Sequence, residues 1–362
     1  MSTLRLLVGF LLFCSFAERA AANADALTGT VRNATTGKPA SGDEVILLRL
    51  ENGMQEESRT RADSRGTFSF TALDPTKSYL VRVIHQGVNY DQSTSSNAAL
   101  AIDVFDAEPR VNGIAGSIEI LRTAAHGKFL HVTDMIEIRN DSKPPVTRSG
   151  GHTFEVFLDA QAKVDSVMAA GPGNIAVLIR ATPAAGDPGH YMVNFPLRPG
   201  ATKFAFNYDL PYDGHAAFQT KHAYPLQQFV VMIPPGVKFS SPSPDFQLLE
   251  TGNSNYQVQA VNGLKAGDGP VFEISGKGLI SPLISQAKPT GRPQWPYLPY
   301  ASLTAPLGIL EPSTPRANPP AAQLSSPLQS VILYSLSAVL LAGCAFLILR
   351  ARKPVASAGA ET

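Results

Sequence analysis

The sequence predicts an all-β exported protein that ends in one membrane-spanning helix. Short alternating segments fill residues 27–278, turn residues separate them at intervals of about 8–12 residues, and a long uncharged segment lies near the C-terminus. No segment of this region keeps a helical apolar repeat over about ten residues, so helices are not expected there. The predicted order is a signal peptide at 1–24, a first β-sandwich at 25–96, a second β-rich region at 97–280, a proline-rich linker at 281–327, a transmembrane helix at 328–349 and a cytoplasmic tail at 350–362.

The N-terminus has the parts of a secretory signal. Arg5 supplies a positive charge, Leu6–Phe16 is an apolar run, and Ala22-Asn23-Ala24 fits a small-x-small cleavage site. Cleavage there would begin the mature chain at Asp25. Because Glu18 interrupts the apolar run, a spanning helix is not expected at this end.

Alternating strands separated by turns make up the first β region. Apolar and polar residues alternate in Leu27–Arg32 and Thr67–Thr71, and Tyr79–Ile84 is another expected strand. Turn residues fill Asn33–Pro39 and Asp63–Gly66. This spacing predicts an antiparallel sandwich.

The same region carries a distinctive set of residues. The set is Gly29-x-Val31-x-Asn33, Gly37-x-Pro39, Val45-x-Leu47, Asp63-x-x-Gly66-x-Phe68-x-Phe70-x-x-Leu73, Tyr79-x-Val81-x-Val83 and Gly87-x-x-Tyr90. In this set the region resembles the carboxypeptidase regulatory-like (prealbumin-like, CnaB-like) β-sandwich domain. The resemblance implies a scaffold in which Gly66 allows a tight turn and Phe68 and Phe70 fill the core. Modules of this superfamily include some classed with carbohydrate-binding folds. The chain as a whole resembles bacterial, particularly acidobacterial-type, single-pass envelope proteins that carry such a domain.

A second β-rich region follows, and its pattern fits an Ig-like sandwich. The expected strands are Ala101–Phe105, Leu130–Arg139, Thr153–Leu158, Lys203–Pro211, Phe229–Ile233, Tyr256–Val261 and Pro270–Ser275. One large sandwich and two smaller ones, divided near Pro183–Gly189, are both compatible with this pattern.

The C-terminal part predicts a spacer and an anchor. Prolines recur through 281–327 and favour an extended, semi-rigid linker. No charged residue occurs from Leu328 to Leu349, which is long enough to cross a hydrocarbon core of about 30 Å as a helix. Arg350, Arg352 and Lys353 follow and belong on the cytoplasmic side. We therefore expect one pass through a bacterial cytoplasmic membrane, with the β regions extracytoplasmic.

The residues give no pattern typical of a catalytic or metal site. The two cysteines, Cys14 and Cys344, lie in the signal and the span, so neither a disulfide nor a thiolate metal site is expected in the exported part. The seven histidines have no metal-ligand spacing and are expected to be exposed or hydrogen-bonded. The sequence therefore predicts no catalytic residues, no metal ligands and no cofactor. The net charge of +1 gives no reason to expect nucleic acid.

One linker segment stands out as a candidate for docking. Trp295, Tyr297 and Tyr300 alternate there with prolines, and proline-rich segments bind grooves with little loss of chain entropy. The alternative is that this segment packs on the chain's own β domain. The sequons at Asn33 and Asn140 would matter only in a host that glycosylates them.

These observations predict a non-enzymatic, membrane-anchored binding or structural protein of the cell envelope, whose partner is an envelope protein or a glycan. A carbohydrate-binding surface module is the first alternative. A hydrolase with a dispersed site is the second.

Overall fold

The alternating segments form β-strands throughout residues 26–277, which the computed structural model describes except at 52, 72, 95–98, 244 and 250–255. Within this part every regular element is a strand, as predicted, and no helix is long and apolar enough to cross a membrane. The described residues all belong to one unit of the chain. The predicted signal peptide, linker, transmembrane helix and tail lie outside them, as do Trp295, Tyr297 and Tyr300.

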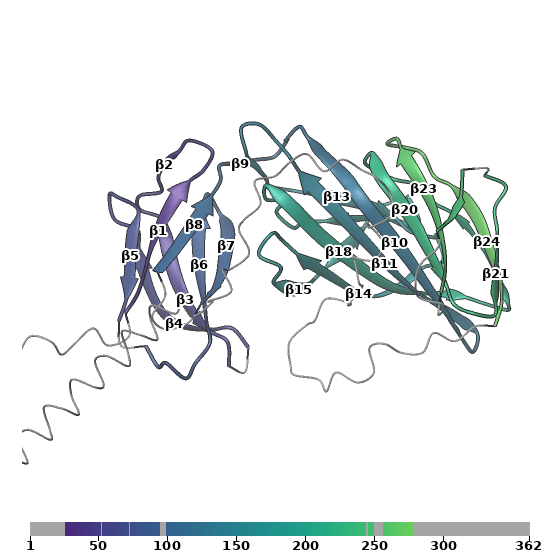
Figure 1. Ribbon diagram of the computed structural model, residues 1–362, viewed down its shortest axis with the longest axis horizontal. Helices are drawn as coiled ribbons and strands as arrows, with labels where there is room; N and C mark the ends of the chain where they lie inside the picture. Colours follow the sequence, from purple (N-terminus) through teal and green to yellow (C-terminus); the bar gives the residue numbers. More distant parts are fainter. Residues whose placement is uncertain are drawn as a thin grey trace, which may run out of the picture. The chain divides into compact units, whose positions relative to one another are not determined.

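Two four-stranded sheets form the first β-sandwich (Figure 1). One contains β2 (Lys38–Pro39), β1 (Leu27–Asn33), β5 (Thr67–Phe70) and β8 (Ala99–Val104), and the other has the order β4 (Gln55–Arg61), β3 (Glu44–Arg49), β6 (Tyr79–His85), β7 (Val88–Thr94). Strict alternation in β1 buries every second side chain between the sheets.

The core of this sandwich confirms the expected roles of three residues. Phe68 and Phe70 are buried, with ring centroids 6.0 Å apart. Gly66 has φ of +78°, and a Cβ there would lie 2.3 Å from the Val31 carbonyl oxygen. Only glycine fits this turn without strain.

One strand assignment was wrong. Residues 97–105 were expected to open the second region, but β8 pairs in parallel with β1. The reason is its side-chain pattern, because Leu100, Ile102 and Val104 all point into the first core. A pairing between strands so far apart in sequence leaves no local signal.

An eight-stranded sheet forms the largest layer of the second region. Its order is β15 (Ala176–Ile179), β14 (Lys163–Ala170), β18 (Gly200–Pro211), β11 (Phe129–Asn140), β10 (Ile114–His126), β20 (Leu226–Ile233), β23 (Gln257–Leu264) and β22 (Gln247–Leu249). Two three-stranded sheets complete it: β13 (Phe154–Phe157), β17 (His190–Val193) and β16 (Ala181–Pro183), and β19 (His215–Gln219), β24 (Val271–Gly276) and β21 (Val237–Ser240). β9 (Ala107–Glu108) and β12 (Thr147–Arg148) form a short parallel pair.

A single core joins these three sheets. Phe204 of the large sheet stacks on Phe154 at 4.4 Å, and Phe229 lies 6.1 Å from Phe272 of the third sheet. Val193, which follows the segment 183–189, is fully buried in the same core. The second region is therefore one sandwich and not two.

Candidate functional site

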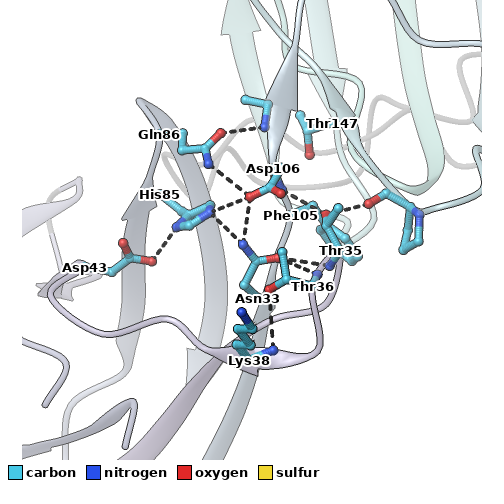
Figure 2. A network of polar contacts seen from close by, with 12 residues as sticks. Asn33, Thr35, Thr36, Lys38, Asp43, His85, Gln86, Phe105, Asp106 and Thr147 are labelled. Atoms are coloured by element: carbon cyan, nitrogen blue, oxygen red, sulfur yellow. Dashed lines mark hydrogen bonds and ion pairs between the residues drawn. The ribbon is translucent and has the colours of Figure 1, made fainter. Parts of the chain in front are cut away.

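A polar network closes one end of the first sandwich, where β1, β6 and β8 end (Figure 2). The Asn33 Nδ2 group donates to Asp106 Oδ1 at 2.7 Å and lies 3.3 Å from His85 Nε2. On its other side, His85 Nδ1 is 2.7 Å from Asp43 Oδ2. Asn33 and His85 are both buried.

The hairpin turn between β6 and β7 belongs to this network. Gln86 has a left-handed φ of +47° and precedes Gly87 at +77°, as a two-residue hairpin turn requires. The Gln86 Nε2 group donates to Asp106 Oδ1 at 2.9 Å, and its Oε1 accepts from the Ala107 N–H at 2.8 Å. These two bonds hold Gln86 in a backbone conformation that residues other than glycine rarely adopt.

The loop after β1 extends the network to the second region. Asn33 Oδ1 accepts from the backbone N–H groups of Thr35 and Thr36, which is an Asx turn. The Thr35 hydroxyl accepts from the Asp106 N–H and donates to the Pro145 carbonyl at 2.6 Å. These bonds tie the first sandwich to the chain that follows it.

Both sequon asparagines are internal hydrogen-bonding groups. Asn140 is 2% exposed, and its Nδ2 donates to the carbonyls of Val146 and Leu197. The Nδ2 of Asn33 is equally occupied by Asp106. A glycan on either amide would therefore require this part of the fold to open.

We call this polar network the brace, because its hydrogen bonds hold strand ends and a turn in place. Burial raises the pKa of Asp43, and the neighbouring His85 opposes that rise. Each ring nitrogen of His85 faces a carboxylate, Asp43 at 2.7 Å and Asp106 at 3.5 Å. The Thr35 hydroxyl, in the same network, is hydrogen-bonded to backbone groups. The arrangement fixes strand ends and a turn.

A groove lies beside this brace, along β7. The Tyr90 hydroxyl donates to the Phe105 carbonyl and pairs with Thr147 Oγ1 at 2.9 Å. The Arg198 guanidinium lies over the rings of Tyr90 and Phe195, at 5.5 and 5.6 Å from their centroids. Its Nε donates to the Asn89 carbonyl at 2.8 Å, and burial lowers the pKa of Arg198.

The groove has a volume of about 420 Å³, within the range of roughly 300–1,000 Å³ typical of ligand pockets. Arg82 and Asp91 form a bidentate ion pair in its wall, at 2.7 and 2.9 Å. The turn Gly171–Gly173, Phe195 and neighbouring prolines also line the groove. The groove thus offers fixed charges between apolar walls.

The histidines do not gather in one place. Five of them lie beside carboxylates, and each has its own acidic partners: His85 with Asp43 and Asp106, His131 with Asp209, His190 with Glu155 and Asp187, His215 with Glu273, and His222 with Glu119. In the described part of the chain, no group of three His, Cys, Asp or Glu residues is placed to hold a metal ion.

The second core encloses charged side chains that the sequence analysis missed. Glu119 and Asp134 are 8% and 3% exposed, and His222 Nε2 lies 3.4 Å from Glu119 Oε2. Burial, with the charge of Glu119, raises the pKa of Asp134 well above its usual value. Burial lowers the pKa of His222, but Glu119 and the Asp268 carbonyl outweigh it, so the net shift is upward. The signal was present, since Asp134 occupies a core position in the alternation Leu130–Ile138.

The comparison with protein families identifies the first sandwich. Residues 26–106 match the family model of the carboxypeptidase regulatory-like domain. This part of the chain is a carboxypeptidase regulatory-like domain. Its match ends at Asp106, the residue on which Asn33, His85 and Gln86 converge, so these four side chains of the brace lie within the domain. The sequence resemblance is thereby confirmed for the domain.

Other comparisons add little. No curated protein matches the chain. Among solved structures, a two-domain M1 zinc metallopeptidase mutant bound to L-tryptophan is 11% identical, with 45% of this chain and 43% of that one covered and a TM-score of 0.28. An M1 zinc metallopeptidase from Deinococcus radiodurans is 12% identical, with 45% and 42% covered and a TM-score of 0.27. The chain thus spans less than half the length of these proteins, and the TM-scores carry no argument about its function.

Proposed function

We propose that this chain is a non-enzymatic, membrane-anchored binding protein of the cell envelope. Its carboxypeptidase regulatory-like domain and its second sandwich together present a groove outside the membrane. The observation that carries the proposal is the Arg198 contact, in which one guanidinium lies over Tyr90 and Phe195 and bonds the backbone of β7. This contact fixes the groove walls before a ligand arrives, which reduces the entropy cost of binding.

The walls favour an extended peptide segment of another envelope protein as the ligand. β7 is an edge strand of its sheet among the described strands, and Asn89–Gln92 of this strand line the groove. Extended peptides bind such edges through backbone hydrogen bonds, while side pockets give specificity. The Arg82–Asp91 pair supplies charges of both signs for polar side chains of that peptide.

The other buried polar side chains support a scaffold role for the fold around the groove. Asn33, His85 and Asp106 hold strand ends, and Asn140 holds a loop. The anchor itself rests on the sequence, namely the uncharged segment 328–349 and the basic residues after it.

Site-specific photo-crosslinking in native membranes tests the binding role. A crosslinking residue replaces Gln92 in the groove of the full-length chain, and the matched control replaces Ser58, which is exposed on β4. The proposal predicts one discrete protein adduct from position 92 and none from position 58. An absence of adducts at 92, or the same adducts at both positions, would contradict it. An adduct that glycosidase removes would favour the carbohydrate-binding alternative.

A further inference from the structure

Residues 220–225 cross from the third sheet to the large sheet, between β19 and β20. We call this segment the crossover. Backbone hydrogen bonds fasten it to the loop 265–270, which joins β23 to β24. The His222 N–H donates to the Asp268 carbonyl at 3.0 Å, and the Gly267 N–H donates back to the His222 carbonyl at 2.8 Å. The backbone of His222 thus joins the two connections to each other.

The side chain of His222 faces the core of the second sandwich. Its Nδ1 lies 2.9 Å from the Asp268 carbonyl oxygen, and because a carbonyl only accepts, Nδ1 carries a hydrogen. The Asp268 carboxylate accepts from the Lys265 N–H instead. On the other side of the ring, Nε2 lies 3.4 Å from Glu119 Oε2 of β10, and the two side chains are 4% and 11% exposed.

This geometry requires a proton between the two groups. A neutral His222 with its hydrogen on Nδ1 has a lone pair on Nε2, which would face the oxygen of Glu119. If Glu119 is ionised as well, a lone pair and a buried negative charge face each other without a hydrogen, which is costly away from water. The contact is therefore favourable when one further proton lies on Nε2 or on the carboxyl group.

Acidic groups outnumber cations around this pair. Glu119 lines two small cavities, and the other titratable groups that line them are Asp134, Asp159, Tyr208, Glu155, Lys221, Tyr224 and His222 itself. The ammonium group of Lys221 lies 4.1 Å from the centroid of the Phe157 ring. Within these two cavities, His222 is thus the cation placed against Glu119.

The direction of the pH effect follows from these contacts. Burial lowers the pKa of His222, but Glu119 and the Asp268 carbonyl raise it more, so the net shift is upward. The stability that the pair contributes is fully present below the ordinary histidine pKa of about 6.5 and is lost as pH rises through the raised pKa of the folded state. Acid therefore strengthens this contact and alkali weakens it.

We propose that His222 and Glu119 form a proton-operated latch, which holds the crossover on the core at low pH and releases it as pH rises. The proton leaves to solvent, and the crossover and the loop 265–270 then separate from β10 together. Tyr224, whose ring stacks on Phe154 at 5.7 Å, leaves the core with the crossover. This switch is independent of the proposed ligand of the groove.

Pulsed hydrogen exchange with mass spectrometry tests the latch in the full mature chain in lipid nanodiscs, from about pH 6 to about pH 8.5. After correction for the intrinsic pH dependence of exchange, peptides with the His222 and Gly267 amides are expected to lose protection above the raised pKa. The loss should reach up to about tenfold per pH unit. Peptides from β18, in the centre of the same sandwich, should keep their protection.

Three variants show which group senses the proton. In Glu119→Gln the amide can donate to the lone pair of neutral His222, so protection of the crossover should no longer depend on pH. Glu273→Gln is the matched control, because Glu273 forms an exposed pair with His215 at 3.3 Å, and it should keep the dependence. Asp134→Asn, beside Glu119 in the core, should keep it too.

The unaltered chain decides the matter even if Glu119→Gln does not fold. The latch is overturned if protection of the crossover in that chain is the same at all pH values, or if β18 loses protection together with it. It is also overturned if Asp134→Asn abolishes the dependence while Glu119→Gln retains it, because Asp134 would then be the sensing group.

Discussion

The carboxypeptidase regulatory-like domain and the second sandwich bury polar groups in different ways. In the domain, the buried polar side chains Asn33 and His85 sit at strand ends and hold turns. In the second sandwich, Glu119 and Asp134 sit in the middle of strands, inside the aromatic core. Side-chain hydrogen bonds therefore hold the strand ends of the domain. The second sandwich instead buries charged groups, and its apolar packing has to offset the free-energy cost of burying them.

The aromatic core is expected to show the largest effect. Phe204 has no exposed area and stacks on Phe154, so Phe204→Ala should lower the free energy of unfolding by about 3–5 kcal/mol. Phe129→Ala at the exposed hairpin end should cost less than about 0.5 kcal/mol. Urea unfolding followed by circular dichroism measures both. Equal losses would mean that the aromatic core does not hold the second sandwich.

The brace of the domain comes next. Asn33→Ala leaves the N–H groups of Thr35 and Thr36 without their side-chain acceptor and removes one of the donors to the Asp106 carboxylate, at a cost of about 1–3 kcal/mol. Asn262→Ala removes an amide that is exposed on β23 and should change stability by less than about 0.5 kcal/mol. The same unfolding experiment compares them. If Asn33→Ala behaved like Asn262→Ala, the network would be incidental to the fold.

The buried acid of the second sandwich should appear as a dependence on pH. Because the pKa of Asp134 is raised in the folded state, the folded chain holds a proton that the unfolded chain releases above the ordinary aspartate pKa. Stability therefore falls as pH rises toward the folded pKa, by up to about 1.4 kcal/mol per pH unit from this group. Asp134→Asn removes this slope, so its advantage over the unaltered chain should grow with pH.

Chemical unfolding at a series of pH values from 4 to 8 tests this slope, with Asp165→Asn as the control at an exposed position of β14. A stability difference for Asp134→Asn that stays constant over this range would contradict the raised pKa.

The smallest effect is expected at an exposed ion pair. Arg32 and Asp103 join β1 to β8 at 2.8 Å, but both side chains are largely in water. Solvent screens such pairs, so Arg32→Gln should leave the unfolding midpoint unchanged within error. A clear loss that disappears in high salt would show that this pair helps hold β8 in the domain.

The sequence predicted the structure of the domain better than the structure of the second sandwich. Gly66, Phe68 and Phe70 could be placed because local alternation and one turn determine their roles. β8 could not, because its parallel partner β1 lies far away along the chain. Likewise, the brace joins Asn33 to Asp106 across 73 positions, and no local pattern links them.

One face of the eight-stranded sheet shows the same limit in another form. Met135, Ile120 and Val230 looked like ordinary apolar strand residues, and only the strand register reveals that they share that face. Trp295, Tyr297 and Tyr300 stay a prediction of a candidate docking segment, with packing on the chain's own β domain as the alternative, because they lie outside the described residues. The burial of Asp134 could have been predicted from the alternation of apolar residues along its strand, but it was missed.

Cell fractionation of two truncated chains tests the central claim, which is that the β regions are anchored outside the membrane. One chain ends after Pro327, before the uncharged segment, and the control ends after Lys353 and removes only the last nine residues of the tail. The proposal predicts that the first is released into the extracytoplasmic fraction, while the second stays with the membrane and exposes its β regions to protease on intact spheroplasts. If both chains fractionate alike, or if the β regions of the longer chain resist protease until the spheroplasts are lysed, the account is contradicted.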